Sequence, residues 1–288
     1  MHSPRDLRRR IKSIGATAQI TRAMQMVAAS KMRKAQQAAI ATRPFARLLY
    51  RIQRNATTQA VGFTHPLLEV RDVRRRAVIL VAADKGLCGA LNTNVFRMAA
   101  QFDARSTIFV TAGRKAAQFV ARTGRALAAE FAYGDSPAYP EARAIAGLAR
   151  DLFLKGEVDQ VQIVATRFVN TLTQEAVCIE YLPVGEIRGL KVPGVESEEA
   201  AAAETDEAVF EPNAEALLDY LLGHYLNIYV YYVLLNAKAS EQSARMVSMK
   251  NATDSAEGLI ESLTLEYNKL RQGAITTELL EIAGGRAE

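Results

Sequence analysis

The residues best placed to do chemistry lie in the glycine-containing segment 84–89 (DKGLCG), which directly follows the apolar run 77–83 (AVILVAA). A turn between a strand and a helix is where many α/β proteins bind phosphate, because backbone N–H groups converge there. The segment matches neither GxGxxG nor GxxxxGK followed by Ser or Thr. We therefore interpret it as a structural turn and predict no nucleotide site.

Nucleophilic or metal-dependent catalysis has little support elsewhere in the chain. The two cysteines, Cys88 and Cys178, are ninety positions apart, and the histidines at 2, 65 and 224 lie in no recognisable motif. No GxSxG, HExxH or paired-carboxylate motif occurs. We predict no catalytic residue, no metal and no cofactor, and the sparse cysteines favour a reducing cytosolic compartment.

The segment that contains the turn alternates strands with helices. Strands are predicted at 77–83, 106–111, 127–131, 158–170 and 175–182, and helices at 91–102, 113–120 and 141–155. This alternation predicts a small α/β sheet that is mostly parallel, with the last two strands forming an antiparallel hairpin.

Both ends of the chain predict long helices, because residues 5–43 and 213–288 contain no proline. Apolar positions from Leu218 to Thr277 recur with a mean spacing of 3.47 residues, close to the heptad value of about 3.5 that predicts a left-handed supercoil. A similar stripe runs from Leu7 to Ala39. A folded-back antiparallel pair is the simplest arrangement, and a parallel pairing with a second copy stays open.

Charge is strongly segregated, although the net charge is only +5. Residues 5–54 carry 13 basic and one acidic side chain, whereas residues 192–237 carry nine acidic and no basic ones. The basic segment could bind nucleic acid or an anionic membrane surface, but Phe45 and Tyr50 are its only aromatic residues, which disfavours base stacking. An acidic protein surface is an equal alternative.

Targeting and membrane-spanning segments are disfavoured. The N-terminus is basic rather than apolar, which excludes a secretory signal and leaves an Arg-rich transit peptide as the competing interpretation. The longest uncharged run, 220–237, is interrupted by polar side chains, so a membrane span is not expected there.

Four extended motifs resemble the gamma subunits of F-type ATP synthases. They are 20–34 (ITRAMQMVAASKMRK), 84–92 (DKGLCGALN), 239–254 (ASEQSARMVSMKNATD) and 267–282 (YNKLRQGAITTELLEI). The resemblance covers essentially the whole chain in order. It implies an α/β fold with a long antiparallel coiled coil of the N- and C-terminal helices and a central Rossmann-like domain. The corresponding predicted domains are 1–57, 75–190, an acidic linker at 191–211, and 212–288.

The resemblance also implies a function. It predicts a non-catalytic rotor shaft inside the hexamer of alpha and beta subunits, with the epsilon subunit and the ring of c subunits as further partners and no nucleic acid. The predicted location is the cytoplasmic face of the bacterial plasma membrane, reached only through the c ring. Contacts with the beta subunits are expected from Met24, Lys31, Arg33, Arg245, Arg271, Gln272, Thr276 and Glu278.

The charges predict the register of the coiled coil. Basic side chains at 5–12 need acidic neighbours, and the densest acidic face of the C-terminal helix lies at 254–266. Opposing Arg9 to Glu261 places Met24 near Met246, to within about one heptad. Residues 267–282 then have no partner in the chain and are too apolar to stand alone in water, so we predict that they form the tip of the shaft.

Overall fold

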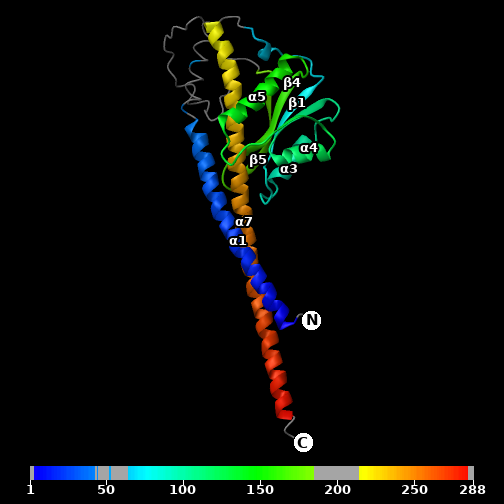
Figure 1. The fold of residues 1–288 in the computed structure, drawn as a ribbon, viewed down its shortest axis with the longest axis vertical. Helices are drawn as coiled ribbons and strands as arrows, with labels where there is room; N and C mark the ends of the chain where they lie inside the picture. The colour runs from blue at the N-terminus through cyan, green and yellow to red at the C-terminus, as the bar shows by residue number, and fades with distance from the viewer. Residues whose placement is uncertain (1–2, 43, 45–51, 53–63, 185–213, 285–288) are drawn as a thin grey trace. The chain divides into compact units, whose positions relative to one another are not determined.

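The computed structural model describes residues 3–42, 44, 52, 64–184 and 214–284 (Figure 1). The chain divides into two compact units. The α/β unit comprises residues 30–244, and the helical unit comprises residues 1–29 and 245–288. Both terminal helices run through both units. The predicted acidic linker, 191–211, lies outside the described residues, and the predicted domain boundaries stay predictions.

A five-stranded sheet forms the centre of the α/β unit. Its strands are β1 (Arg76–Val81), β2 (Thr107–Ala112), β3 (Ala126–Phe131), β4 (Gln160–Phe168) and β5 (Gln174–Leu182). Their order is β3-β2-β1-β4-β5, and every pairing is parallel except the antiparallel β4–β5 hairpin. The structure thereby confirms all five predicted strands and the predicted hairpin.

Alternate residues of the central strands face two different helical layers. Val78 and Leu80 of β1 pack with α3 (Leu91–Ala99) and α4 (Arg114–Arg122). Ile79 and Val81 face the opposite layer, where α5 (Tyr139–Leu154) and part of α7 cover the sheet (Figure 1). Burial on both faces explains why the sequence of β1 is continuously apolar instead of alternating.

The terminal helices are α1 (Pro4–Ala41) and α7 (Ala214–Gly284), 38 and 71 residues long. In the α/β unit, one face of α7 is buried, since Leu226, Val230 and Leu234 belong to the core shared with α5 and the sheet. The short 3-10 helix η1 (Pro66–Leu68) packs Leu67 into the same core. The predicted N-terminal helical domain, 1–57, stays a prediction, because most of residues 43–57 lie outside the described part of the chain.

The helical unit is an antiparallel pair of α1 and α7. Thr21 Oγ1 and Thr253 Oγ1, both buried, share a hydrogen bond of 2.7 Å. Gly15 faces Ile260, whose Cδ1 would lie 4.0 Å from a Cβ added to the glycine. Buried residues of both helices follow the predicted stripes, namely Leu7, Ala18 and Ala28 of α1 with Met249, Ala256 and Leu263 of α7. The chain therefore pairs its own two helices.

The observed register differs from the predicted one by about one helical turn. Thr21 lies opposite Thr253, whereas the charge-based pairing would have placed it four residues earlier, at Met249. Arg22 forms an ion pair with Glu257, and Arg9 pairs with Asp6 of its own helix. The predicted pairing of Arg9 with Glu261 is therefore wrong, because exposed charges contribute little and the buried seam sets the register. The offset stays within the predicted heptad.

Candidate functional site

The turn after β1 contains a carboxylate, that of Asp84, which binds the N-terminus of a helix. Asp84 Oδ1 accepts a hydrogen bond of 2.9 Å from the backbone N–H of Arg114, the first residue of α4. A helix N-terminus is where a phosphate would bind in such a fold, because unpaired N–H groups point outward there. The Asp84 carboxylate occupies this position at α4, which follows β2, whereas the helix that follows the turn itself is α3. The hydrogen bond therefore joins the turn after β1 to α4.

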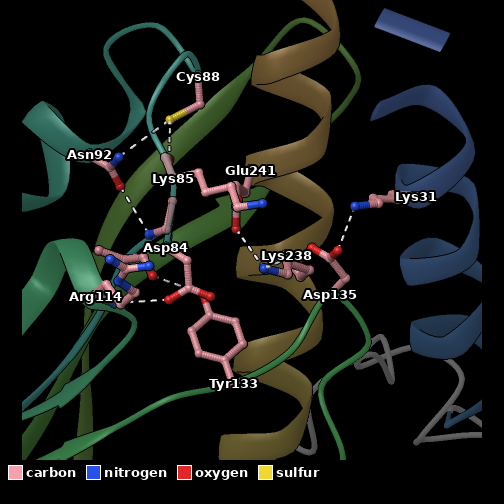
Figure 2. Close-up of polar contacts among 12 residues, drawn as sticks. Lys31, Asp84, Lys85, Cys88, Asn92, Arg114, Tyr133, Asp135, Lys238 and Glu241 are labelled. Atoms are coloured by element: carbon pink, nitrogen blue, oxygen red, sulfur yellow. Dashed lines mark hydrogen bonds and ion pairs between the residues drawn. The ribbon is translucent and has the colours of Figure 1, made fainter. Parts of the chain in front are cut away.

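Cys88 belongs to the packing of this turn. Its side chain is buried in a small apolar cluster with Ala83, Leu91 and Ala244. Asn92 crosses the turn, since its Oδ1 accepts from the N–H of Ala83 at 3.1 Å and its Nδ2 lies 3.4 Å from Cys88 Sγ (Figure 2). These contacts give the cysteine a structural role.

A glycine brings α4 close to the end of β1. Gly113 precedes α4 with φ of +96°, and a Cβ added to it would lie 2.1 Å from Ala82 O. The same carbonyl accepts a hydrogen bond of 3.0 Å from the hydroxyl of Tyr133 in the loop after β3. Burial, followed by the negative charges of Glu241 and Asp84, raises the pKa of Tyr133 well above its ordinary value. Tyr133 therefore stays a neutral donor that fixes this loop to β1.

A chain of four charged side chains starts beside this tyrosine (Figure 2). Lys238 Nζ of α7 lies 3.0 Å from Glu241 Oε2, 3.7 Å from Asp135 Oδ1 and 4.9 Å from the centre of the Tyr133 ring. Asp135 Oδ2 accepts a hydrogen bond of 2.5 Å from Lys31 Nζ of α1. The hydrogen bond from Lys31 and the nearby charge of Lys238 lower the pKa of Asp135, despite some desolvation.

The sequence around Lys238 and Asp135 does not indicate that these residues belong to a cluster. Lys238 directly follows the uncharged run that ends at Ala237, and Glu241 is three residues later on the same helix. That spacing is a signal for an ion pair on one helical face, but it does not show that the pair is buried. Asp135 comes from a loop between β3 and α5 that carries no recognisable motif.

The predicted beta-subunit contacts on α1 differ in exposure. Arg33 is exposed, Met24 is half-buried in the helix pair, and Lys31 is half-buried beside Asp135. On α7, Arg245 is buried, while Arg271, Gln272 and Thr276 are exposed. The side chain of Glu278 lies outside the described part. The structure brings these residues to two different helices and does not gather them into one cluster.

The C-terminal part of α7 extends beyond the start of α1. Because Thr21 lies opposite Thr253, Pro4 lies opposite about residue 270, and α7 continues to Gly284. Apolar side chains in this region are exposed, with Ile275 at 48%, Leu279 at 61% and Leu280 at 67%. Exposed apolar side chains grouped in this way are typical of a surface that binds a protein, a membrane or a ligand.

Two possible site types have no counterpart among the described residues. Across 3–42, 64–184 and 214–284, no three His, Cys, Asp or Glu side chains are grouped so that they could hold a metal ion. None of the helices in those ranges is both long enough and apolar enough to cross a membrane.

Comparison with known proteins gives matches over nearly the full chain. A family model described as ATP synthase matches residues 3–287. The ATP synthase gamma chain of Opitutus terrae is 44% identical over 294 residues, which cover 99% of this chain and 98% of that relative. The ATP synthase gamma chain of Desulforamulus reducens is 42% identical over 290 residues, covering 100% and 99% of the two chains.

Solved structures agree with these relatives. A chain of the central stalk and c-ring structure of the Tetrahymena thermophila mitochondrial ATP synthase has a TM-score of 0.61 and 26% identity, with 81% of this chain and 99% of that chain covered. A chain of the Euglena gracilis mitochondrial ATP synthase rotor has a TM-score of 0.66 at 19% identity, covering 94% and 98%, and shares the fold. With the family model and the relatives matching from end to end, this chain belongs to the ATP synthase gamma chain family.

Proposed function

We propose that this chain is the central rotor shaft of a bacterial F-type ATP synthase and carries no catalytic residue. Its coiled coil and the C-terminal part of α7 turn inside a hexamer of alpha and beta subunits, and its α/β unit contacts the epsilon subunit and the ring of c subunits. Ion flow through the ring turns the shaft, and the angle of the shaft biases each beta subunit between conformations.

The observation that carries the proposal is the exposed apolar surface at the end of α7. Ile275, Leu279 and Leu280 lie beyond the start of α1, so the chain's own helix pair does not cover them. Burying a large aliphatic side chain is worth about 1.5–3 kcal/mol, which favours a partner that encloses this segment. A sleeve formed by the hexamer supplies that environment, as family membership implies.

The polar side chains of the same segment suit a turning contact. Arg271, Gln272 and Thr276 are exposed beside the apolar positions, and Arg33 is exposed on α1. Cations there can meet acidic loops of the beta subunits, and each exposed pair adds little affinity, so contacts can break and re-form. We propose these four as beta-subunit contacts, together with Glu278. Met24 and Arg245, which are less accessible, remain predicted contacts.

The proposal that this chain binds no nucleotide is supported by the contacts of Asp84. Asp84 occupies the N-terminus of α4, so a nucleotide phosphate would meet a carboxylate there. Energy conversion then depends on the beta subunits, and this chain transmits motion. The predicted location is the cytoplasmic face of the plasma membrane, where the c ring holds the shaft. The comparisons give no support to an adaptor that binds nucleic acid or an anionic membrane surface.

Affinity purification of the full chain from its native membranes tests the proposal. The tagged chain should carry alpha, beta, epsilon and c subunits at fixed stoichiometry, and native mass spectrometry measures this. Recovery of the chain as a free protein, or bound to nucleic acid with a steep salt dependence, would contradict the proposed function.

A further inference from the structure

Four charged residues connect both long helices to one loop of the sheet. We name Lys31 of α1, Asp135 of the loop between β3 and α5, and Lys238 and Glu241 of α7 the clamp. Their charges alternate in sign along the chain of contacts, with Asp135 between the two lysines (Figure 2). All four belong to the α/β unit. The clamp therefore joins three elements to one another: α1, the loop between β3 and α5, and α7.

Half of the clamp is buried at an energetic cost. The side chains of Lys238 and Glu241 are only 1% and 3% exposed. Taking two ions out of water costs several kcal/mol each, and an apolar pair of the same volume is often at least as stable. Stability alone therefore does not explain this pair. A charged pair with fixed geometry does specify how α7 is oriented about its own axis, which an apolar pair specifies less well.

The loop end of the clamp is held firmly to the sheet. Tyr133, two residues before Asp135, donates a hydrogen bond of 3.0 Å to Ala82 O at the end of β1, and its ring lies against Lys238. Gly113 packs against the same carbonyl, where a Cβ would clash. The Asp135 carboxylate is thus a fixed point on the sheet from which both helices can be held.

Lys31, at the α1 end of the clamp, makes a directional contact that the apolar residues of α1 do not provide. In the α/β unit, the buried apolar residues of α1 are Met32 and Ala35, a flexible side chain and a small one. Such contacts specify the rotation of a helix poorly. The 2.5 Å hydrogen bond from Lys31 Nζ to Asp135 Oδ2 adds a directional contact one residue before Met32.

We infer that the clamp makes the α/β unit and both long helices turn as one body, so that torque passes from the sheet into α1 and α7 together. This inference rests on the proposed rotor function and assigns Lys31, Asp135, Lys238 and Glu241 as positioning residues of the shaft. Lys31 then acts inside the chain, through Asp135, and not as a beta-subunit contact.

Torsional stiffness of the assembled complex is the test. Cys178 on β5 is exposed, whereas Cys88 is buried. In a complex whose alpha and beta subunits have no accessible cysteine, a bead can therefore be attached to the α/β unit at Cys178. With the hexamer fixed and no turnover, the variance of the bead angle measures the stiffness. Lys31→Gln should raise this variance by about twofold, because it removes one contact of the clamp. Asp135→Asn should raise it at least as much, because Asp135 contacts both Lys31 and Lys238.

Three comparisons make the result specific. Lys31→Arg keeps the cation and should restore the wild-type variance. Lys34→Gln removes the same charge from an exposed position on α1 and should leave the variance unchanged. The double variant Lys31→Gln/Asp135→Asn should equal Asp135→Asn, because that single variant already removes the contact with Lys31.

The inference is overturned if Lys31→Gln matches Lys34→Gln, if the double variant shows the sum of two independent effects, or if Asp135→Asn assembles normally and leaves the stiffness unchanged. Should Asp135→Asn fail to assemble, the comparison of Lys31→Gln with Lys31→Arg decides alone. The proposed function fails separately, if the wild-type bead does not turn when ATP is added.

Discussion

Gly113 has no room for a side chain. Its φ of +96° is unfavourable for other residues, and a Cβ would lie 2.1 Å from Ala82 O. We expect Gly113→Ala to lower the free energy of unfolding by about 3 kcal/mol or more, because strain and a backbone clash add. Urea denaturation of the full chain measures this.

Gly147 of α5 is the matched control. Its Cβ position is open, with no heavy atom within 4 Å and no unusual φ. Gly147→Ala should stabilise the chain by about 0.5–1 kcal/mol, since glycine is unfavourable inside a helix. Equal effects of the two substitutions would show that the approach of Gly113 to β1 is not as close as the structure has it.

Buried tyrosines predict a loss of stability at alkaline pH. Burial raises the pKa of Tyr133 and Tyr181 well above the ordinary value of 10.0. Above pH 10 the unfolded chain releases these protons while the folded chain keeps them, so ionisation lowers the free energy of the unfolded state and stability falls as pH rises. Each tyrosine adds up to about 1.4 kcal/mol per pH unit to this slope.

Tyr133→Phe isolates one contribution. The variant loses the hydrogen bond to Ala82 O, worth about 1 kcal/mol near neutral pH, but it no longer titrates. Denaturant unfolding between pH 9 and pH 11.5 should therefore show a shallower decline for the variant than for the wild type. Parallel curves would mean that Tyr133 ionises equally in the folded and unfolded chains.

At the scale of single residues, the sequence predicted the turn at 84–89 but not the contacts that Asp84 and Cys88 make there. Its glycines and its place after an apolar run are local features, so the turn could be read directly. The clamp could not be predicted from the sequence, because Lys31, Asp135 and Lys238 are distant in the chain and come together only when it folds. Nothing local to Lys238 indicates burial, because long charged side chains are rarely buried.

The register of the helix pair can be tested by cross-linking. Thr21→Cys with Thr253→Cys replaces two side chains whose oxygens lie 2.7 Å apart, so we expect a disulfide on mild oxidation. Met24→Cys with Met246→Cys is the pair that the charges alone predicted. In the observed register these two positions are offset by four or five residues, about 6–8 Å along the helix, and should not cross-link. Gel mobility without reductant separates the outcomes, and the opposite pattern would refute the observed register.

At the scale of elements, hydrophobic periodicity predicted most of the fold. The five strands and the seam positions Ala18, Thr21, Ala256 and Leu263 follow directly from residue spacing. The proline-free range 5–43 also predicted the extent of α1, which runs from Pro4 to Ala41. Charge gave the antiparallel direction of the pair but missed its register by one turn, because exposed ion pairs are weak beside the packing of Ala and Thr in the seam.

The complete complex should cover the C-terminal part of α7. Lys269 is exposed in this chain and lies near the point where α1 begins, whereas Lys155 is exposed at the end of α5. An amine-reactive label should modify both lysines of the free chain. In the complex we expect protection of Lys269 and continued labelling of Lys155, as peptide mass spectrometry will show. Full labelling of Lys269 in an intact complex would mean that the hexamer does not enclose this segment.

At the scale of the whole molecule, the sequence motifs carried the functional prediction further than composition did. A net charge of +5 and two helical stripes left nucleic acid, membrane and protein partners open. Family membership and the exposed apolar end of α7 favour a protein sleeve. The sequence alone could not show which residues join the sheet to the long helices, because those residues are far apart in the chain.

Rotation of single complexes tests the central claim most directly. With the hexamer fixed to a surface and a bead on Cys178, addition of ATP should turn the bead in one direction. It should pause at three angles, because the hexamer contains three beta subunits. A bead that only fluctuates about one angle while the same complexes hydrolyse ATP would contradict the account, since this chain would then not be the part that turns.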